Sequence, residues 1–229
     1  MAGLIATAGP FRLEPRAERG PFHALASAIA HQQLHGVAAR RILARLVALF
    51  TDVDFPAPHQ VLALPDAQLR AVGFSFAKVA ALKDLAAKTI AGVVPAAEEL
   101  EALSDAELIE RISSVRGIGR WSVEMLLMFY LQRPDVLPVD DFAVRNGFRL
   151  AYGLKSMPTA RALAQFGERW KPYRSMAAWY LWRAVELART KRLPRCARPP
   201  RIAQVAVKPR ARLSKAARAR AVPARSARR

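Results

Sequence analysis

Apolar residues recur at intervals of three and four positions through most of the chain, the spacing that gathers them on one face of an α-helix. Short breaks that contain Gly or Pro separate these stretches, and the alternating pattern that is typical of strands is nearly absent. The pattern therefore predicts an all-α fold.

The predicted helices follow one another with short connections. The first includes the apolar residues of 22–29, and a polar knuckle at 31–36 (His-Gln-Gln-Leu-His-Gly) joins it to a second helix with apolar residues over 42–50. Further helices are expected at 61–71, 76–91, 104–115, from 120 or 121 to 131, 141–151, 158–168 and 172–188, where prolines at 158 and 172 suit first-turn positions.

Two glycines interrupt the helical pattern between residues 104 and 131. Ser104 and Glu107 match a capping box at the start of the helix that precedes the glycines. The helix that follows Gly117-Ile118-Gly119 is apolar nearly all round, which predicts that it is buried. Glycines permit positive φ and a close approach of the backbone, and the unpaired N–H groups at a helix start attract an anion such as phosphate. Taken alone, however, a Gly-x-Gly between helices is more simply a tight turn.

The charge of the chain points to a polyanionic partner, with nucleic acid the first candidate. Its 37 Lys and Arg against 18 Asp and Glu give a net charge of +19, which is unusual for a metabolic enzyme. Fourteen of the basic residues lie from Lys191 onward, in a stretch rich in Ala and Pro, so that the rest carries only +5. We therefore expect a folded domain over 1–192 and a disordered basic tail over 193–229, which either adds non-specific phosphate contacts or is a solubility tail.

The composition also disfavours several classes of protein. The single cysteine, Cys196, forms no internal disulfide, which predicts an intracellular protein. No apolar run approaches the roughly 18 residues of a membrane span, and the N-terminus lacks a signal pattern, so no membrane partner is expected. The four histidines and one cysteine show no zinc spacing and cannot hold an iron–sulfur cluster, so we expect no cofactor.

Three motifs give the sequence a resemblance to a known family. They are Gly117-Ile118-Gly119-Arg120-Trp121-Ser122, then Arg133-Pro134-Asp135-Val136-Leu137-Pro138-Val139-Asp140-Asp141-Phe142, and then Arg169-Trp170-Lys171-Pro172-Tyr173-Arg174-Ser175. In that order and spacing they resemble the DNA-3-methyladenine glycosylase II family of the helix-hairpin-helix DNA glycosylase superfamily. The resemblance covers about 21–192, including Gln32-Gln33-Leu34 with Ala38-Ala39. It implies a two-lobed helical fold with its hairpin at about 104–131, in a compact version without the N-terminal α/β domain of longer members.

Asp141 is the catalytic residue that the resemblance implies. From the pattern alone, an aspartate that opens a helix after a proline-containing loop is an N-cap. In the family, the aspartate at this position faces the scissile glycosidic bond, where its carboxylate stabilises the developing oxocarbenium sugar and helps to position the attacking water. Asp140 is the second choice because the two residues are adjacent; otherwise it is the cap or support.

The resemblance also implies hydrolysis without strand cleavage, and an aromatic cleft for the base. Bifunctional members of the superfamily carry a lysine nucleophile two residues after the second hairpin glycine, where this chain has Trp121. Trp121 and Trp182 are the implied base-binding residues, and Trp182 also points away from the apolar stripe of its helix. The alternatives are core filling for Trp121 and packing against the neighbouring lobe for Trp182. Indole faces suit a positively charged alkylated purine.

The implied DNA contacts lie in the knuckle and the hairpin. Leu34, presented with Gln33, matches the residue that fills the stack when the nucleotide rotates out of the duplex; an ordinary exposed leucine is the alternative. The hairpin positions that match DNA contacts are Gly117, Gly119, Arg120 and Ser122, and the carbonyls of Val115 and Gly117 match a region that holds a monovalent cation in the family. Arg145 and Arg174 are further candidates for phosphate contacts, with a solvated surface position as the alternative.

Together these features predict a monomeric, monofunctional DNA glycosylase of base excision repair. Its expected substrate is double-stranded DNA with alkylated bases such as 3-methyladenine, its product is an abasic site, and in a bacterium it works in the cytoplasm and nucleoid. One alternative is a glycosylase for a different lesion on the same scaffold. The other is a non-catalytic helix-hairpin-helix DNA-binding protein, which the presence of Asp141, Trp121 and Trp182 together disfavours, since a carboxylate beside a phosphate track opposes DNA binding.

Overall fold

The structure, a computed structural model, describes residues 1–14, 19–34 and 36–194. These residues form twelve α-helices and one short 3-10 helix, without a strand, which confirms the all-α prediction. The predicted tail lies outside the described residues from 195 onward, Cys196 included. Among the described helices, none has both the length and the apolar character that a membrane crossing requires.

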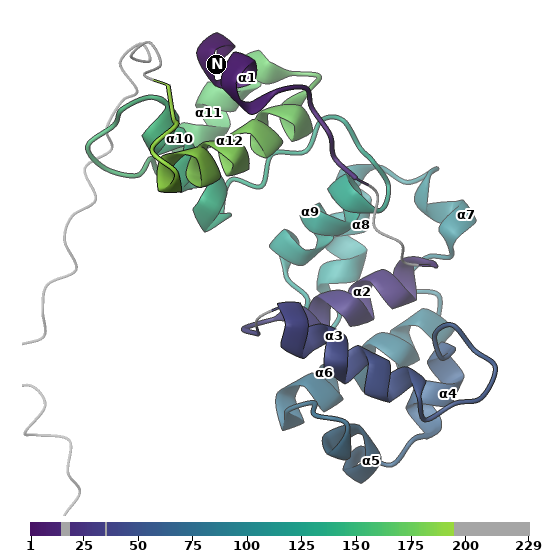
Figure 1. Cartoon of the computed structure of the whole chain (residues 1–229). Helices are drawn as coiled ribbons and strands as arrows, with labels where there is room; N and C mark the ends of the chain where they lie inside the picture. The colour runs from purple at the N-terminus through teal and green to yellow at the C-terminus, as the bar shows by residue number, and fades with distance from the viewer. Residues whose placement is uncertain (15–18, 35, 195–229) are drawn as a thin grey trace, which may run out of the picture.

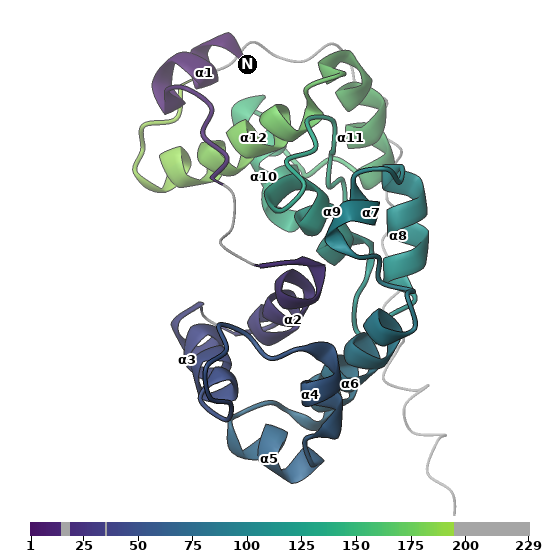
Figure 2. The ribbon, with the colours of Figure 1, turned by 90° about the vertical axis from the view of Figure 1, so that its right-hand side faces the viewer.

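The helices form two lobes (Figure 1). One lobe joins the two ends of the described chain: it holds α1 (Ala2–Ala8), α10 (Phe142–Ala151), α11 (Ala160–Gly167), the 3-10 helix η1 (Glu168–Trp170) and α12 (Arg174–Arg189). We call this the smaller lobe. The larger lobe holds α2 (Pro21–His31), α3 (Gly36–Val47), α4 (Pro58–Ala63), α5 (Asp66–Ala71), α6 (Phe76–Ile90), α7 (Ala97–Leu100), α8 (Asp105–Ser113) and α9 (Arg120–Phe129). In the view of Figure 2, the loop after α9 leads back into the first lobe.

Helix α2 is the centre of the larger lobe. It packs against α3, α6 and α9, and eight of its eleven residues are buried. Three of these, Ala24, Ala26 and Ala30, are small enough to let neighbouring helices approach closely, while Leu25 and Ile29 fill the space between them. The knuckle at the end of α2 is therefore presented by a helix that is held on nearly every side.

The smaller lobe depends on the packing of α10 against α12. Gly147 in α10 is buried, and a Cβ atom there would lie 1.9 Å from the carbonyl oxygen of Leu181 in α12. Helix α1 rests on α12, and the Tyr180 hydroxyl donates to the Gly9 carbonyl at 3.1 Å. The sequence pattern did not predict α1, because only Leu4 of its seven residues is buried.

Several predicted helix boundaries are confirmed and others are wrong. Ser104 and Glu107 form the predicted capping box of α8, and α10 begins directly after Asp141. The prolines at 158 and 172 do not lie in first turns: Thr159 caps α11, and α12 begins two residues after Pro172. The single helix expected over 61–71 is two helices, α4 and α5, because the chain turns at residues 64–65.

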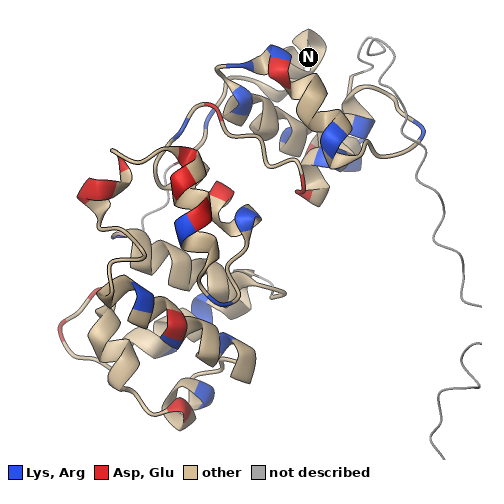
Figure 3. Ribbon diagram, turned by 180° about the vertical axis from the view of Figure 1, so that it is seen from behind, with Lys and Arg blue, Asp and Glu red and all other residues tan. Residues whose placement is uncertain are grey.

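Acidic residues gather at one place in the larger lobe, on α7 and α8 (Figure 3). Glu98 and Glu99 lie in the first turn of α7, and Asp105 and Glu107 lie in the first turn of α8. The first turn of α8 is the end of that helix remote from the glycine turn at 117–119. The negative charge is therefore kept away from the part of the hairpin that is expected to meet phosphate.

Candidate active site

The carboxylate of Asp141 lies between two tryptophans that are distant in sequence. The indole N–H of Trp121, in the first turn of α9, donates to Asp141 Oδ2 at 2.8 Å. The indole N–H of Trp182, in the middle of α12, donates to Asp141 Oδ1 at 3.1 Å. The structure thus brings the three residues together at the junction of the two lobes, where α9, α10 and α12 meet.

Asp141 is at the same time the N-cap of α10. The backbone N–H of Val144 donates to Asp141 Oδ1 at 2.7 Å, which satisfies one of the unpaired donors at the helix start. The cap therefore fixes the side chain that the two indoles also hold. Asp140, the second-choice catalytic residue, is exposed at the preceding turn.

The two indoles have different environments. Trp121 is 45% exposed, whereas Trp182 is half-buried and stacks on Phe129 of α9 with ring centroids 5.8 Å apart and an interplanar angle of 21°. Trp182 therefore both packs against the other lobe and reaches Asp141. Phe129 was not singled out from the sequence, since it continues the apolar pattern of α9.

The hairpin turn requires its first glycine. Gly117 has φ 75°, and a Cβ there would lie 3.2 Å from the Cβ of Ala81 in α6. Helix α6 also holds the start of the turn, because Asp84 Oδ2 accepts from the Arg116 N–H at 2.7 Å and Lys88 donates to the Ser114 carbonyl. The result is a fixed turn that ends at Gly119, the N-cap of α9.

The side chains after this turn differ in how they meet solvent. The Arg120 side chain is exposed, and its Nε lies 2.8 Å from Oε1 of Glu124, which is only 2% exposed. Burial raises the pKa of Glu124, and the hydrogen bond from Arg120 opposes that rise. Glu124 thus orients Arg120 at the start of α9. Ser122 is buried, so the structure does not place its side chain at the surface.

Arg145 and Arg174, the further candidates for phosphate contacts, have partners inside the protein. The Arg145 guanidinium donates twice to the Pro158 carbonyl, at 3.0 and 2.8 Å. Arg174 is bound by two carboxylates. Both arginines therefore stabilise the lobe that contains Asp141.

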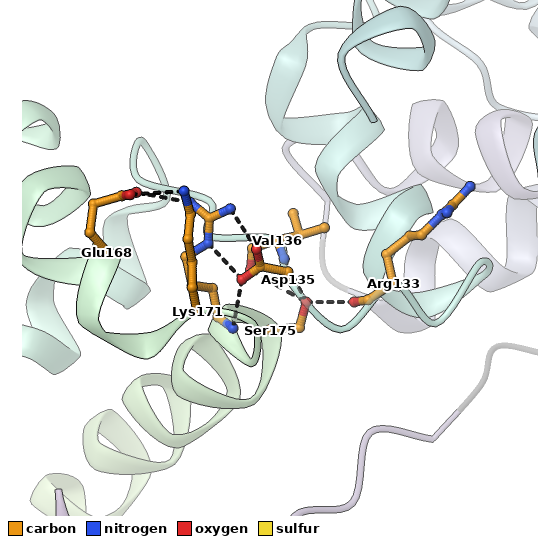
Figure 4. A network of polar contacts seen from close by, with 7 residues as sticks. Arg133, Asp135, Val136, Glu168, Lys171 and Ser175 are labelled. Carbon is orange, nitrogen blue, oxygen red and sulfur yellow. Dashed lines mark hydrogen bonds and ion pairs between the residues drawn. The ribbon is translucent and has the colours of Figure 1, made fainter. Parts of the chain in front are cut away.

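Asp135 and Ser175, labelled in Figure 4, belong to a polar network that holds the loop leading to Asp141. Arg174 is part of the same network. Its Nε and Nη2 donate to the two oxygens of Asp135, at 2.7 and 2.9 Å. The buried hydroxyl of Ser175 donates to the Arg133 carbonyl at 2.6 Å and accepts from the Val136 N–H at 2.9 Å. These contacts join the loop to the start of α12, the helix that carries Trp182.

We expect Arg174→Ala to destabilise the fold by about 2 kcal/mol at pH 7, because a partly buried carboxylate loses charged hydrogen bonds. Those bonds hold the pKa of Asp135 below its usual range, so their contribution is present above about pH 4, the usual pKa of an aspartate, and is lost as the pH falls below it. Urea unfolding at pH 7 and at pH 3 measures both effects.

Lys83→Ala is the matched control, since the Asp66 partner of Lys83 is largely exposed. It is expected to change the free energy of unfolding by less than about 0.5 kcal/mol at either pH. An Arg174→Ala penalty that is equal at pH 7 and pH 3 would contradict the role given to the Asp135 pair.

The carbonyls that match the family's cation region already accept hydrogen bonds within the protein. The Val115 carbonyl accepts from the Ile118 N–H at 3.0 Å, and the Gly117 carbonyl accepts from Gln32 Nε2 at 2.7 Å. Each carbonyl oxygen has a second lone pair, so a cation remains compatible with this donor set. Elsewhere in the described chain, no group of three His, Cys, Asp or Glu side chains is placed to hold a metal ion.

Comparisons with known proteins give one consistent result. A family model described as "HhH-GPD superfamily base excision DNA repair protein" matches residues 26–172. DNA-3-methyladenine glycosylase 1 of Schizosaccharomyces pombe is 42% identical over 186 residues, which cover 81% of this chain and 82% of that protein.

Solved structures show the same similarity. A 3-methyladenine DNA glycosylase of Schizosaccharomyces pombe, in complex with abasic DNA, matches with a TM-score of 0.74 and 42% identity, over 81% of this chain and 90% of that chain. DNA-3-methyladenine glycosidase from Bacillus halodurans matches with a TM-score of 0.73 and 30% identity, over 83% and 87% of the two chains.

Proposed function

Because this chain belongs to the HhH-GPD superfamily of base excision DNA repair proteins, we propose that it is a DNA glycosylase that hydrolyses the N-glycosidic bond of alkylated purines in double-stranded DNA. The observation that carries the proposal is the Asp141 carboxylate, held by the two indole N–H groups at the junction of the lobes. The names of its relatives support 3-methyladenine as one of the bases removed.

The hydrogen bonds of Asp141 leave one acceptor position for the reaction. Oδ1 accepts from the Val144 N–H and from Trp182, whereas Oδ2 accepts from Trp121. A carboxylate oxygen accepts about two hydrogen bonds, so Oδ2 retains a position for the attacking water. The negative charge of Asp141 stabilises the oxocarbenium-like sugar, while Oδ2 orients the water toward it.

Base recognition in this proposal depends on charge. An alkylated purine such as 3-methyladenine is positively charged, and the exposed indole face of Trp121 attracts a cation by up to about 2 kcal/mol when the contact is desolvated. The positive charge also weakens the glycosidic bond, so the base leaves without a strong general acid. This requirement agrees with a site centred on a single carboxylate.

The DNA is gripped by the knuckle and the hairpin. Leu34 is 41% exposed beside Gln33, and fills the gap that the rotated nucleotide leaves. The turn at Gly117 and Gly119 offers backbone N–H groups to a phosphate, with the exposed Arg120 beside it. We propose that the protein acts as a monomer, and that its basic tail adds non-specific contacts.

The test is incubation of the purified protein with a duplex that carries methylated purines. We expect release of the free base and strands that stay intact until alkali cleaves the abasic sites. Borohydride should trap no covalent adduct, because Trp121 occupies the position of the lyase lysine and the ammonium of Lys88 is bound to Asp84 and the Ser114 carbonyl. Strand breaks before alkali would contradict the monofunctional mechanism, and binding without base release would favour a non-catalytic DNA-binding protein.

A further inference from the structure

Two side chains connect the knuckle to other parts of the larger lobe, one from outside the knuckle and one from within it. Lys78, in the first turn of α6, donates through Nζ to the carbonyls of Ala30 and Gln32, both at 2.8 Å. Gln32 in turn donates through Nε2 to the Gly117 carbonyl at 2.7 Å. A continuous series of hydrogen bonds therefore links α6, the end of α2 and the glycine turn of the hairpin.

The ammonium group of Lys78 lies at the C-terminal end of α2, where a positive charge is favourable. The last carbonyls of α2 have no donors within that helix, and they carry the negative end of its dipole, so an ammonium group satisfies both. The site has a cost, since burial lowers the pKa of Lys78. Helix α6 itself has its own N-cap in Ser75 and does not need this lysine.

Gln33 and Leu34 directly follow the segment that Lys78 holds, and the proposed function places them at the DNA base stack. Gln33 has φ 55°, a left-handed conformation that is unfavourable for a residue other than glycine. Leu34 follows directly and is exposed, and its N–H donates to the His31 carbonyl at 3.2 Å. A strained turn of this kind persists only where the surrounding structure holds it in place.

We infer that Lys78 and Gln32 are positioning residues that fix Leu34 relative to the phosphate-binding turn at Gly117. They thereby couple binding of the DNA backbone to the insertion of Leu34 into the base stack. The inference rests on the proposed function. A side chain that replaces a rotated base acts on the stack only if it is fixed relative to the phosphate that the protein holds, because any slack lets the nucleotide return. Gln32 provides that connection directly.

The test compares two DNA substrates that carry the same methylated purine. In the first the lesion is paired in a duplex, and in the second it lies in a short unpaired bubble, where no stack has to be opened. A residue that positions Leu34 matters for the paired lesion, whereas general damage to the fold lowers excision of both. The ratio of the two single-turnover rates is therefore the quantity to measure.

We expect Lys78→Met and Gln32→Ala each to lower that ratio about tenfold, with little change for the bubble, which corresponds to one decade in rate. The double variant should have a rate ratio no lower than that of the more impaired single variant, because both residues act through one series of contacts. Lys78→Arg, which keeps a charged donor, should recover part of the ratio. Lys83→Met on the same helix should leave it unchanged, since Lys83 pairs with Asp66 instead.

Equal losses on the two substrates, or no loss on either, would overturn the inference. If Lys78→Met does not fold, Gln32→Ala leaves the lysine in place and decides the question alone. Wild-type protein that releases no base even from the bubble would instead overturn the proposed function, and the inference with it. A normal wild-type rate on the bubble with an unchanged ratio in the variants overturns only the inference.

Discussion

Asp141→Asn should lower the single-turnover rate of base release from a methylated-purine duplex by about 10³-fold, which is the scale of losing one preorganised electrostatic contact to a transition state. Asparagine keeps the size of the side chain, and its oxygen still caps α10 through the Val144 N–H. The negative charge is lost, and the amide group that replaces Oδ2 cannot accept from Trp121. DNA binding should remain within a few-fold of wild type, as measured by fluorescence anisotropy.

Asp140→Asn is the control that decides between the adjacent aspartates. Asp140 is exposed and lies outside the pair of indoles, so its variant should keep excision within about threefold of wild type, a change below 1 kcal/mol. Loss of activity in Asp140→Asn with activity retained in Asp141→Asn would show that the neighbouring carboxylate is the catalytic one.

Gly147→Ala should destabilise the protein by about 3 kcal/mol or more, at the upper end of the range for overpacked cores. The new Cβ would lie 1.9 Å from the oxygen and 2.6 Å from the carbonyl carbon of Leu181, and both are backbone atoms that no rotamer change can move. Relief requires α10 and α12 to separate. Since Trp182 follows Leu181, the separation also moves the indole away from Asp141. The excision rate should therefore be lower even at temperatures at which the variant is still folded.

Thermal and urea unfolding measure the stability change, and about 3 kcal/mol corresponds to a fall of roughly 10 °C in Tm for a domain of this size. Gly36→Ala is the matched control: the nearest atom to its added Cβ is the Arg40 Nη1 at 3.3 Å, the end of a flexible side chain. A Gly147→Ala protein with the stability of Gly36→Ala would show that the two helices tolerate a wider separation.

The sequence predicted local features of the fold well where a short stretch contains the whole cause. Ser104 and Glu107 lie three residues apart and cap α8 as predicted, and the all-round apolar pattern of α9 correctly predicted its burial. The predicted starts of α11 and α12 were wrong, because a proline is equally suited to the first turn of a helix and to the residues just before its N-cap. Thr159, with a side chain that accepts from the Ala162 N–H, decides the first case.

The candidate site was predicted in its residues but not in its contacts. Resemblance to a family singled out Asp141, Trp121 and Trp182, yet nothing in the pattern shows that both indoles donate to one carboxylate across separations of 20 and 41 residues. Lys78 was missed because a lysine in the first turn of a helix gives no sign of a partner in another helix. Gly147 did carry a signal, since an isolated glycine inside a helix indicates close packing.

The paired indoles at Asp141 also give the protein an intrinsic optical probe. The chain has four tryptophans, and two of them, Trp121 and Trp182, share hydrogen bonds to the carboxylate beside which the base would bind. Trp170 packs among the rings of the smaller lobe, and Trp179 packs against Tyr180, so neither depends on that carboxylate. If a base binds there as proposed, we expect it to change the surroundings of Trp121 and Trp182 first, so that the emission of the unlabelled protein would report nucleotide rotation in real time.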